Sequence, residues 1–370
     1  MTLEERIISR RKDIKSDRLS MSIGELAGLY DKGELDIHPK FQRVLRWEDH
    51  QKSRLIESII LGIPIPPIFV AQDPTGKWDV VDGVQRLGTV FEFLGLLRDQ
   101  NGAVKPPLVL SATHLLPELD GLVFKASKKQ TRQFPPSLQV DFNRARLDLQ
   151  ILLRESDPAT KYELFERLNT GGSIASDQEV RNCVLVWINE PLFDWLTGTI
   201  CKDKGFQACV ELTDRAEERQ YRMELVLRFL AFRDMPESEL KEIIDIGEFL
   251  NQKNRDLALS KSSQKQAGTV FVDTFALLAK ALGPDAFRKF VPSRGGFSGG
   301  FLISAYEAVA LGVAHNIAAW RSKNKPEARL KSLVQELWSK EEFVKHIGIG
   351  VPARDRIRWS VPFGRKHFQP

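Results

Sequence analysis

The fold is decided by the stretch Trp78-Asp79-Val80-Val81-Asp82-Gly83-Val84-Gln85-Arg86-Leu87. Its aromatic and β-branched residues predict a short strand over 78–81, and Asp82-Gly83 then predicts a sharp turn. After the turn, apolar residues recur at helical spacing, at Leu87, Val90, Phe91, Leu94 and Leu97. A turn from a strand into a helix directs backbone N–H groups outward at the positive end of the helix dipole, where anions bind.

The residues of this turn are suited to a phosphate group. Gly83 has no side chain to obstruct a ligand, and the backbone of Val84 and the amide of Gln85 are predicted to contact it. Arg86 offers a bidentate fork to phosphate oxygens, and Asp82 is suited to hold a metal ion or orient a water. The alternative is an ordinary Asp-Gly turn followed by a surface arginine.

A second group of candidate site residues lies upstream, in Pro39-Lys40-Phe41-Gln42-Arg43-Val44-Leu45-Arg46-Trp47. The cations Lys40 and Arg43 and the amide of Gln42 are suited to phosphate, and Phe41 or Trp47 is suited to stack on a base. The alternative is a solvated connector whose two aromatic residues fill the core.

The surrounding sequence predicts an α+β domain. Ser22-Ile23-Gly24-Glu25 is a capping box, which predicts a helix that ends near Gly33 and leads to a brief strand over 35–37. A second helix is predicted over 49–61, and further strands over 68–71 and 147–153. Between them, about residues 101–144 form a basic, proline-containing insertion that we expect to be partly ordered loop.

Beyond Asp157-Pro158, nearly every periodic segment predicts a helix, while the glycine-rich residues 293–300 predict a flexible loop. The predicted helices cover 159–168, 178–188, 216–232, 270–282, 302–320 and 328–338. We therefore expect a charged N-terminal extension over 1–19, a nucleotide-binding α+β domain over 20–156, and a mostly α-helical domain over 157–370 with a basic C-terminal tail.

Local clusters of charge say more about partners than the total does. A net charge of +5 over 370 residues is modest, but residues 122–147 hold six basic residues against one acidic, and residues 351–370 hold five against one. Each cluster is suited to neutralise DNA phosphates, or alternatively is a solvated loop and tail. Three cysteines without a close pair, and apolar runs that are interrupted by charges, favour a cytoplasmic protein without a membrane span.

Four motifs, in this order, resemble the N-terminal domain of GmrSD-type restriction systems, the family also known as domain of unknown function 262. The resemblance covers roughly residues 20–185. The motifs are Phe41-Gln42-Arg43 with Trp47, Ser58-Ile59 with Gly62-Ile63-Pro64-Ile65-Pro66, Val81-Asp82-Gly83-Val84-Gln85-Arg86-Leu87, and Phe165-Glu166-Arg167-Leu168-Asn169-Thr170-Gly171-Gly172.

The resemblance implies a fold similar to ParB and sulfiredoxin, a small mixed sheet with helices, in which the loop from Asp82 to Arg86 contacts nucleotide phosphates. It also implies association with hydrolysis of a nucleoside triphosphate and with defence against foreign or modified DNA. Mg²⁺ is the expected ion, and Arg167 and Asn169 are implied to line the site. The family usually has glutamine at the position of Val84, so this departure favours binding over hydrolysis.

A nuclease domain of the HNH type is not predicted, because His315, His346 and His367 are far apart and the last two lack a suitably spaced acidic neighbour. Three hypotheses follow. The chain is an NTP-binding and NTP-hydrolysing component of a prokaryotic, DNA-targeting, anti-phage restriction system, with Asp82 and Arg86 as catalytic residues. Alternatively it is a non-catalytic DNA- or partner-binding regulator, or a nuclease or nickase that acts from the N-terminal site. The expected partners are DNA, a separate nuclease or effector, and a second copy of the chain.

Overall fold

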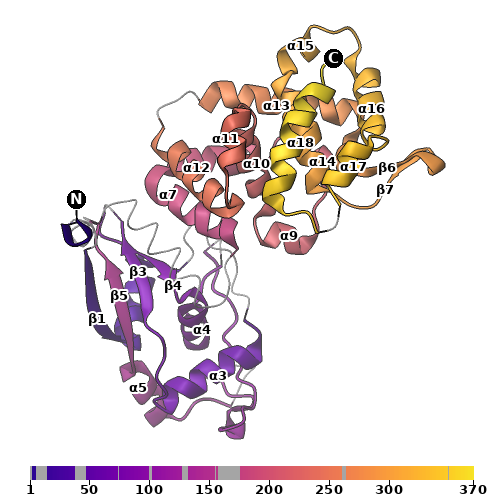
Figure 1. Cartoon of the computed structure of the whole chain (residues 1–370). Helices are drawn as coiled ribbons and strands as arrows, with labels where there is room; N and C mark the ends of the chain where they lie inside the picture. Colours follow the sequence, from indigo (N-terminus) through magenta and orange to yellow (C-terminus); the bar gives the residue numbers. More distant parts are fainter. Residues whose placement is uncertain are drawn as a thin grey trace. The chain divides into compact units, whose positions relative to one another are not determined.

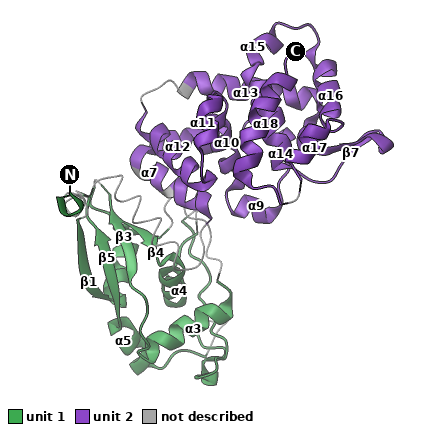
Figure 2. Ribbon diagram, viewed as in Figure 1, with its two compact units in different colours: residues 1–174 green, residues 175–370 purple. Residues whose placement is uncertain are grey.

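The chain forms two compact units, Met1–Ile174 and Ala175–Pro370 (Figures 1 and 2). The structure is a computed structural model, and it describes residues 2–5, 15–37, 47–73, 75–99, 102–126, 132–154, 156, 176–260, 264–348 and 350–370. Each unit has its own buried apolar cluster.

Unit 1 is built on a five-stranded mixed sheet with the strand order β1-β5-β3-β4-β2. Strand β1 is antiparallel to β5 and β3 is antiparallel to β4, whereas β3 with β5 and β2 with β4 are parallel pairs. The strands are β1 (Ser16–Ser22), β2 (Leu35–Asp36), β3 (Ile68–Gln72), β4 (Trp78–Asp82) and β5 (Arg146–Leu152). The prediction of a mixed sheet followed by a mostly helical part is therefore confirmed.

The helices of unit 1 begin close to the positions that their capping residues indicate. The capping box is confirmed, because Ser22 Oγ accepts from the Glu25 N–H at 3.2 Å and a Glu25 carboxylate oxygen accepts from the Ser22 N–H at 2.8 Å. This unit contains the helices α2 (Ile23–Asp31), α3 (Asp49–Ile60), α4 (Val84–Leu94) and α5 (Pro136–Arg144).

Strand β1 corrects the expected boundary at residue 19. Residues 16–19, which the sequence assigned to a charged extension, form the first half of β1 and pair with β5. Most of β1 is exposed, so it carries no apolar alternation that would predict a strand. Its backbone pairing with β5 holds it in place.

The insertion between α4 and β5 supplies part of the core. Phe93 of α4 packs edge-to-face against Phe124, Phe134 and Phe142, each with ring centroids 5.4 Å apart. All four rings are buried, and Phe142 belongs to α5. The expectation of a partly ordered loop therefore underestimated this segment, because its aromatic residues are too widely spaced in sequence to form a periodic pattern.

Unit 2 is mostly helical, as predicted, but two of the predicted helices are each divided in two. Gln220, at φ 60°, separates α9 from α10, and Asn316 separates α14 from α15. The helices are α7 (Asp177–Trp195), α8 (Lys204–Cys209), α9 (Asp214–Glu218), α10 (Tyr221–Phe232), α11 (Glu237–Glu242), α12 (Ile246–Leu259), α13 (Gln264–Ala281), α14 (Ile303–His315), α15 (Ile317–Arg321), α16 (Pro326–Leu337), α17 (Glu341–His346) and α18 (Ala353–His367). None of the helices in the described ranges has both the length and the apolar character of a membrane span.

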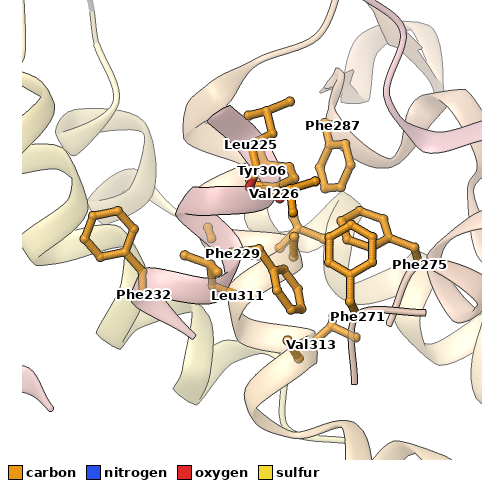
Figure 3. Packing of buried hydrophobic residues seen from close by; sticks show 14 of the residues in the cluster. Leu225, Val226, Phe229, Phe232, Phe271, Phe275, Phe287, Tyr306, Leu311 and Val313 are labelled. Carbon is orange, nitrogen blue, oxygen red and sulfur yellow. Dashed lines mark hydrogen bonds between the residues drawn. The ribbon is translucent and has the colours of Figure 1, made fainter. Parts of the chain in front are cut away.

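Aromatic side chains fill the core of unit 2 (Figure 3). The rings of Phe271 and Phe275 on α13 lie 4.5 Å apart, and Phe229 of α10 lies 4.9 Å from Phe271. Tyr306 of α14 is fully buried, and its hydroxyl donates to the Leu225 carbonyl at 2.8 Å. This hydrogen bond removes the penalty of burying the tyrosine hydroxyl among apolar rings.

Helices α14 and α18 approach each other so closely that only glycine fits at the crossing. A Cβ on Gly364 would lie 2.2 Å from the carbonyl oxygen of Ala308, and a Cβ on Gly312 would lie 2.4 Å from the carbonyl oxygen of Gly364. The backbones themselves are therefore in contact, and α18 is a packed helix of the unit.

The glycine-rich segment forms part of a short hairpin. Strands β6 (Lys289–Val291) and β7 (Gly296–Ser298) are antiparallel, and the rings of Phe290 and Phe297 lie 5.2 Å apart across them. A short helical turn and Gly295, at φ 60°, reverse the chain between the strands. The prediction of a flexible loop over 293–300 was wrong for 296–298, because three-residue strands are too short to show alternation.

Candidate functional site

The turn at Gly83 joins β4 directly to α4, as the sequence predicted (Figure 1). Gly83 has φ 100°, and a Cβ added to it would lie 2.4 Å from Cδ1 of the buried Ile68. Glycine is therefore favoured by the backbone conformation, and a Cβ would also force the buried Ile68 side chain of β3 to shift. Within the described residues, α4 begins without a side-chain cap. The turn therefore keeps the geometry of an anion-binding helix N-terminus.

Asp82 and Arg86 form an ion pair at the side of this turn. Arg86 Nη2 donates to Asp82 Oδ2 at 2.6 Å, and Nη1 donates to the carbonyl oxygens of Pro66 and Pro67, the latter at 3.2 Å. The Arg86 side chain is 13% exposed and that of Asp82 is 33% exposed. Arg86 therefore joins the start of α4 to the segment that precedes β3.

These contacts change the role that Arg86 is suited to play. Both terminal nitrogens of its guanidinium group already contact protein oxygens, so they do not present an open bidentate fork to phosphate. Its positive charge still lies beside the N-terminus of α4. The predicted role of Arg86 in phosphate binding stays a prediction, and the backbone of the turn is the better-placed candidate for direct contact.

Trp47 lies beside Gln85, so the structure brings together two residues that the sequence placed in one site. The backbone N–H of Trp47 donates to Gln85 Oε1 at 3.2 Å. The Trp47 side chain is also half-buried against the core of unit 1. Both the site interpretation and the core interpretation of Trp47 are therefore compatible with its position.

The other predicted site residues lie outside the described part of the chain. They are Lys40, Gln42, Arg43, Arg167 and Asn169, together with Phe41, and the predicted helix over 159–168 also falls there. In the ranges that are described, no three His, Cys, Asp or Glu side chains are grouped as metal ligands.

Sequence reasoning missed the contribution of Pro66 and Pro67 to the site. The ion pair itself had a signal in the sequence, which is the spacing of Asp82 and Arg86. Residues four apart at the start of a helix face each other and can form an ion pair. Proline keeps its backbone carbonyl as an acceptor, but nothing in the sequence indicates that the carbonyls of Pro66 and Pro67 face Arg86.

The structure corrects the prediction of a basic C-terminal tail. Its residues form α18, and most of its arginines contact the interior of unit 2. Arg356 donates to both carboxylate oxygens of Glu307, at 2.7 and 3.1 Å, and Glu307 is fully buried. Arg228 of α10 donates to the same carboxylate at 3.3 Å. The arginine that was expected to contact phosphate therefore neutralises an internal acid.

Two further arginines of α18 bind backbone carbonyls. Arg358 donates to the Ile243 carbonyl at 2.7 Å, and Arg365 donates to the carbonyls of Phe232 and Arg233, both at 2.9 Å. The sequence could not show this, because a basic residue with an internal acceptor looks the same in sequence as a solvated one.

The other basic cluster, residues 122–147, is described only in part. Arg132 donates to the Asp120 carbonyl at 2.6 Å, whereas Arg144 and Arg146 are exposed. Lys128 and Lys129 are not among the described residues. DNA binding by this cluster stays a prediction.

Comparison with known proteins places the turn within a recognised domain. Residues 23–186 match the family described as GmrSD restriction endonuclease, N-terminal domain. The match begins with α2, contains Asp82 to Arg86, and extends into α7 of unit 2. No curated protein matches the chain. Over residues 23–186, a little under half of its length, this chain is therefore similar to the N-terminal domain of the GmrSD restriction endonucleases.

Proposed function

We propose that the chain is the nucleotide-binding component of a restriction-like defence system, and that the phosphates of a nucleoside triphosphate bind at the N-terminus of α4. The observation that carries this proposal is the turn from β4 through Gly83 into α4, with its positive φ, its lack of a side-chain cap in the described residues and the adjacent Arg86. A helix N-terminus attracts phosphate through its N–H groups and its dipole. The family match covers the same residues.

Magnesium belongs to the same proposal. Mg²⁺ in nucleotide sites is held by one or two carboxylates together with phosphate oxygens, and Asp82 is the carboxylate of this turn. Because Asp82 Oδ2 is 2.6 Å from Arg86 Nη2, the ion and the guanidinium group would share one carboxylate. This sharing, and the apolar Val84 in the first turn, favour a binding regulator over an efficient hydrolase.

Gln85→Glu is the sharpest test, because it adds a negative charge to the proposed phosphate site and keeps a side-chain oxygen opposite Trp47. The carboxylate can still accept from the Trp47 N–H, and an acid in the first turn of a helix is favourable for the helix itself. We expect unchanged or higher thermal stability and at least about tenfold weaker nucleotide binding, because two like charges about 4 Å apart repel by several kcal/mol in a protein environment.

Gln51→Glu is the matched control, because Gln51 occupies the first turn of α3 and its Oε1 accepts from the Glu48 N–H at 3.0 Å. Binding of ATP, GTP, CTP and UTP to the full chain would be measured by calorimetry, with and without Mg²⁺. If the unmodified chain binds none of the four nucleotides, the nucleotide proposal is wrong. If the two variants bind a nucleotide equally well, the site lies elsewhere. Phosphate release by the unmodified chain, lost in Asp82→Asn, would favour the hydrolase.

A further inference from the structure

A different segment presents the positive charge that the sequence had assigned to the C-terminal tail. Residues 321–331 connect the end of α15 to the first turns of α16, and we call them the basic connector. They hold five basic residues against one acidic residue, Glu327. All five cations are exposed: Arg321, Lys323, Lys325, Arg329 and Lys331.

Two of these five cations form ion pairs with described residues of unit 2. Arg321 pairs with Asp273 of α13, and Arg329 pairs with Glu336 at 3.3 Å, where both side chains are about half exposed. Exposed pairs of this kind contribute little to stability and exchange readily with other anions. The three lysines make no ion pair with any described residue.

The end of α18 lies beside the basic connector. Trp320 Nε1 donates to the Phe368 carbonyl at 2.9 Å, which holds the start of the basic connector against the chain beyond α18 (Figure 1). The pKa of His367 is lowered mainly by burial. The hydrogen bond with the Leu333 carbonyl and the charge of Glu336 oppose this shift, whereas the charges of Lys340 and Arg329 add to it. Lys340 and Lys366 are both exposed here.

The basic connector also has a defined backbone conformation. Lys325 lies in the left-handed region, at φ 50° and ψ 60°, and Pro326 follows it at the first position of α16. Proline fixes its own φ at a value that suits the first position of a helix. A connector that is already ordered loses less conformational entropy when it binds a partner than a flexible charged tail would.

We propose that the basic connector is the surface through which unit 2 contacts the phosphate backbone of double-stranded DNA. Its charge is complementary to a duplex, which carries one negative charge per about 1.7 Å of its axis. The choice of DNA as the partner rests on the proposed function in a restriction-like system, whereas the position of the surface rests on the exposed and mostly unused cations. The contact is with phosphate, so it is independent of base sequence.

The test is the salt dependence of duplex binding by the full chain, measured by fluorescence anisotropy without nucleotide. Lys323→Gln with Lys325→Gln should reduce the slope of log K against log salt by about 1.8, because each lost phosphate contact contributes about 0.9 to the slope. Both lysines are exposed, so thermal stability should not change. Lys202→Gln with Lys204→Gln is the matched control, because these two lysines are also exposed, in unit 2 and two residues apart.

The expected result is a weaker and less salt-dependent complex for the connector variant only. Equal slopes for the two double variants would overturn the proposal, as would failure of the unmodified chain to bind a duplex. Binding to anionic lipid vesicles with no binding to DNA would also overturn it. None of these results depends on nucleotide, so the DNA surface and the nucleotide site fail or succeed separately.

Discussion

Glu307→Gln should destabilise unit 2 strongly, although it preserves the shape of the side chain. Glu307 is fully buried on α14, where its carboxylate accepts from Arg356 of α18 and from Arg228 of α10. The substitution removes the negative charge and leaves two guanidinium groups facing a neutral amide. No cavity is created, so the loss of stability reports the lost charge together with the exchange of one acceptor oxygen for an amide NH2 group that cannot accept from an arginine.

The magnitude follows from the burial of the group. Removing one partner of a buried ion pair is destabilising by about 3–5 kcal/mol. For a unit of this size, each kcal/mol lowers the melting temperature by about 2–4 °C, so a decrease of about 6–20 °C is expected. Arg228 keeps its ion pair with Glu224 at 2.8 Å, so Arg356 is the cation that loses its counter-charge, and the lower part of this range is favoured.

Thermal unfolding of the full chain, followed by circular dichroism at 222 nm, is the assay. Glu336→Gln is the control, because Glu336 pairs with Arg329 at the surface and should contribute less than about 1 kcal/mol. The double variant Glu307→Gln with Arg356→Gln should lose less stability than the sum of the two single variants. Equal melting temperatures for Glu307→Gln and Glu336→Gln, or strict additivity in the double variant, would refute the reasoning.

Gly83→Ala should lower the free energy of unfolding by more than Gly76→Ala does in chemical denaturation. Both glycines have positive φ, but only the Cβ at Gly83 meets a side chain at less than 3 Å, so equal losses would contradict the close approach to β3. Gly364→Ala should reduce the yield of folded protein or its melting temperature, since the new Cβ would lie 2.2 Å from the Ala308 carbonyl oxygen, and a variant as stable as the parent would show that the helices can separate. Burial raises the pKa of Cys209 from 9.0 to about 12, so the stability that this thiol contributes is complete below about pH 9 and is lost as pH rises towards 12. Cys209→Ser should therefore flatten the loss of stability above pH 9, and an identical pH profile for the variant would count against this.

Much of the fold follows from local patterns in the sequence. The capping box at Ser22, the turn at Gly83 and the helical spacing after Leu87 all depend on neighbouring residues, and the structure confirms each of them. Strand β1 and the hairpin β6–β7 were missed for the opposite reason. Their stability comes from pairing with a partner strand, and they bury too few side chains to leave a periodic signal.

The candidate site was predictable as a location but not as a set of contacts. Glycine after a short strand and before an apolar helix is sufficient to place the turn. The engagement of Arg86 by Asp82 and by the carbonyls of Pro66 and Pro67 depends on how β3 and β4 lie together, which no local pattern contains. The same limit explains the C-terminal arginines, whose acceptors are distant in sequence, such as Glu307, which lies 49 residues before Arg356.

That separation has a consequence for biosynthesis. Proteins emerge from the ribosome N-terminal end first, so α14 is made before the helix that neutralises it. Until α18 emerges, Glu307 lacks one of its two arginines, and Gly312 of α14 lacks its backbone contact with Gly364 of α18. We therefore expect nascent chains that stop short of residue 353 to expose an apolar helix with an incompletely compensated acid, and to depend on chaperones until α18 docks.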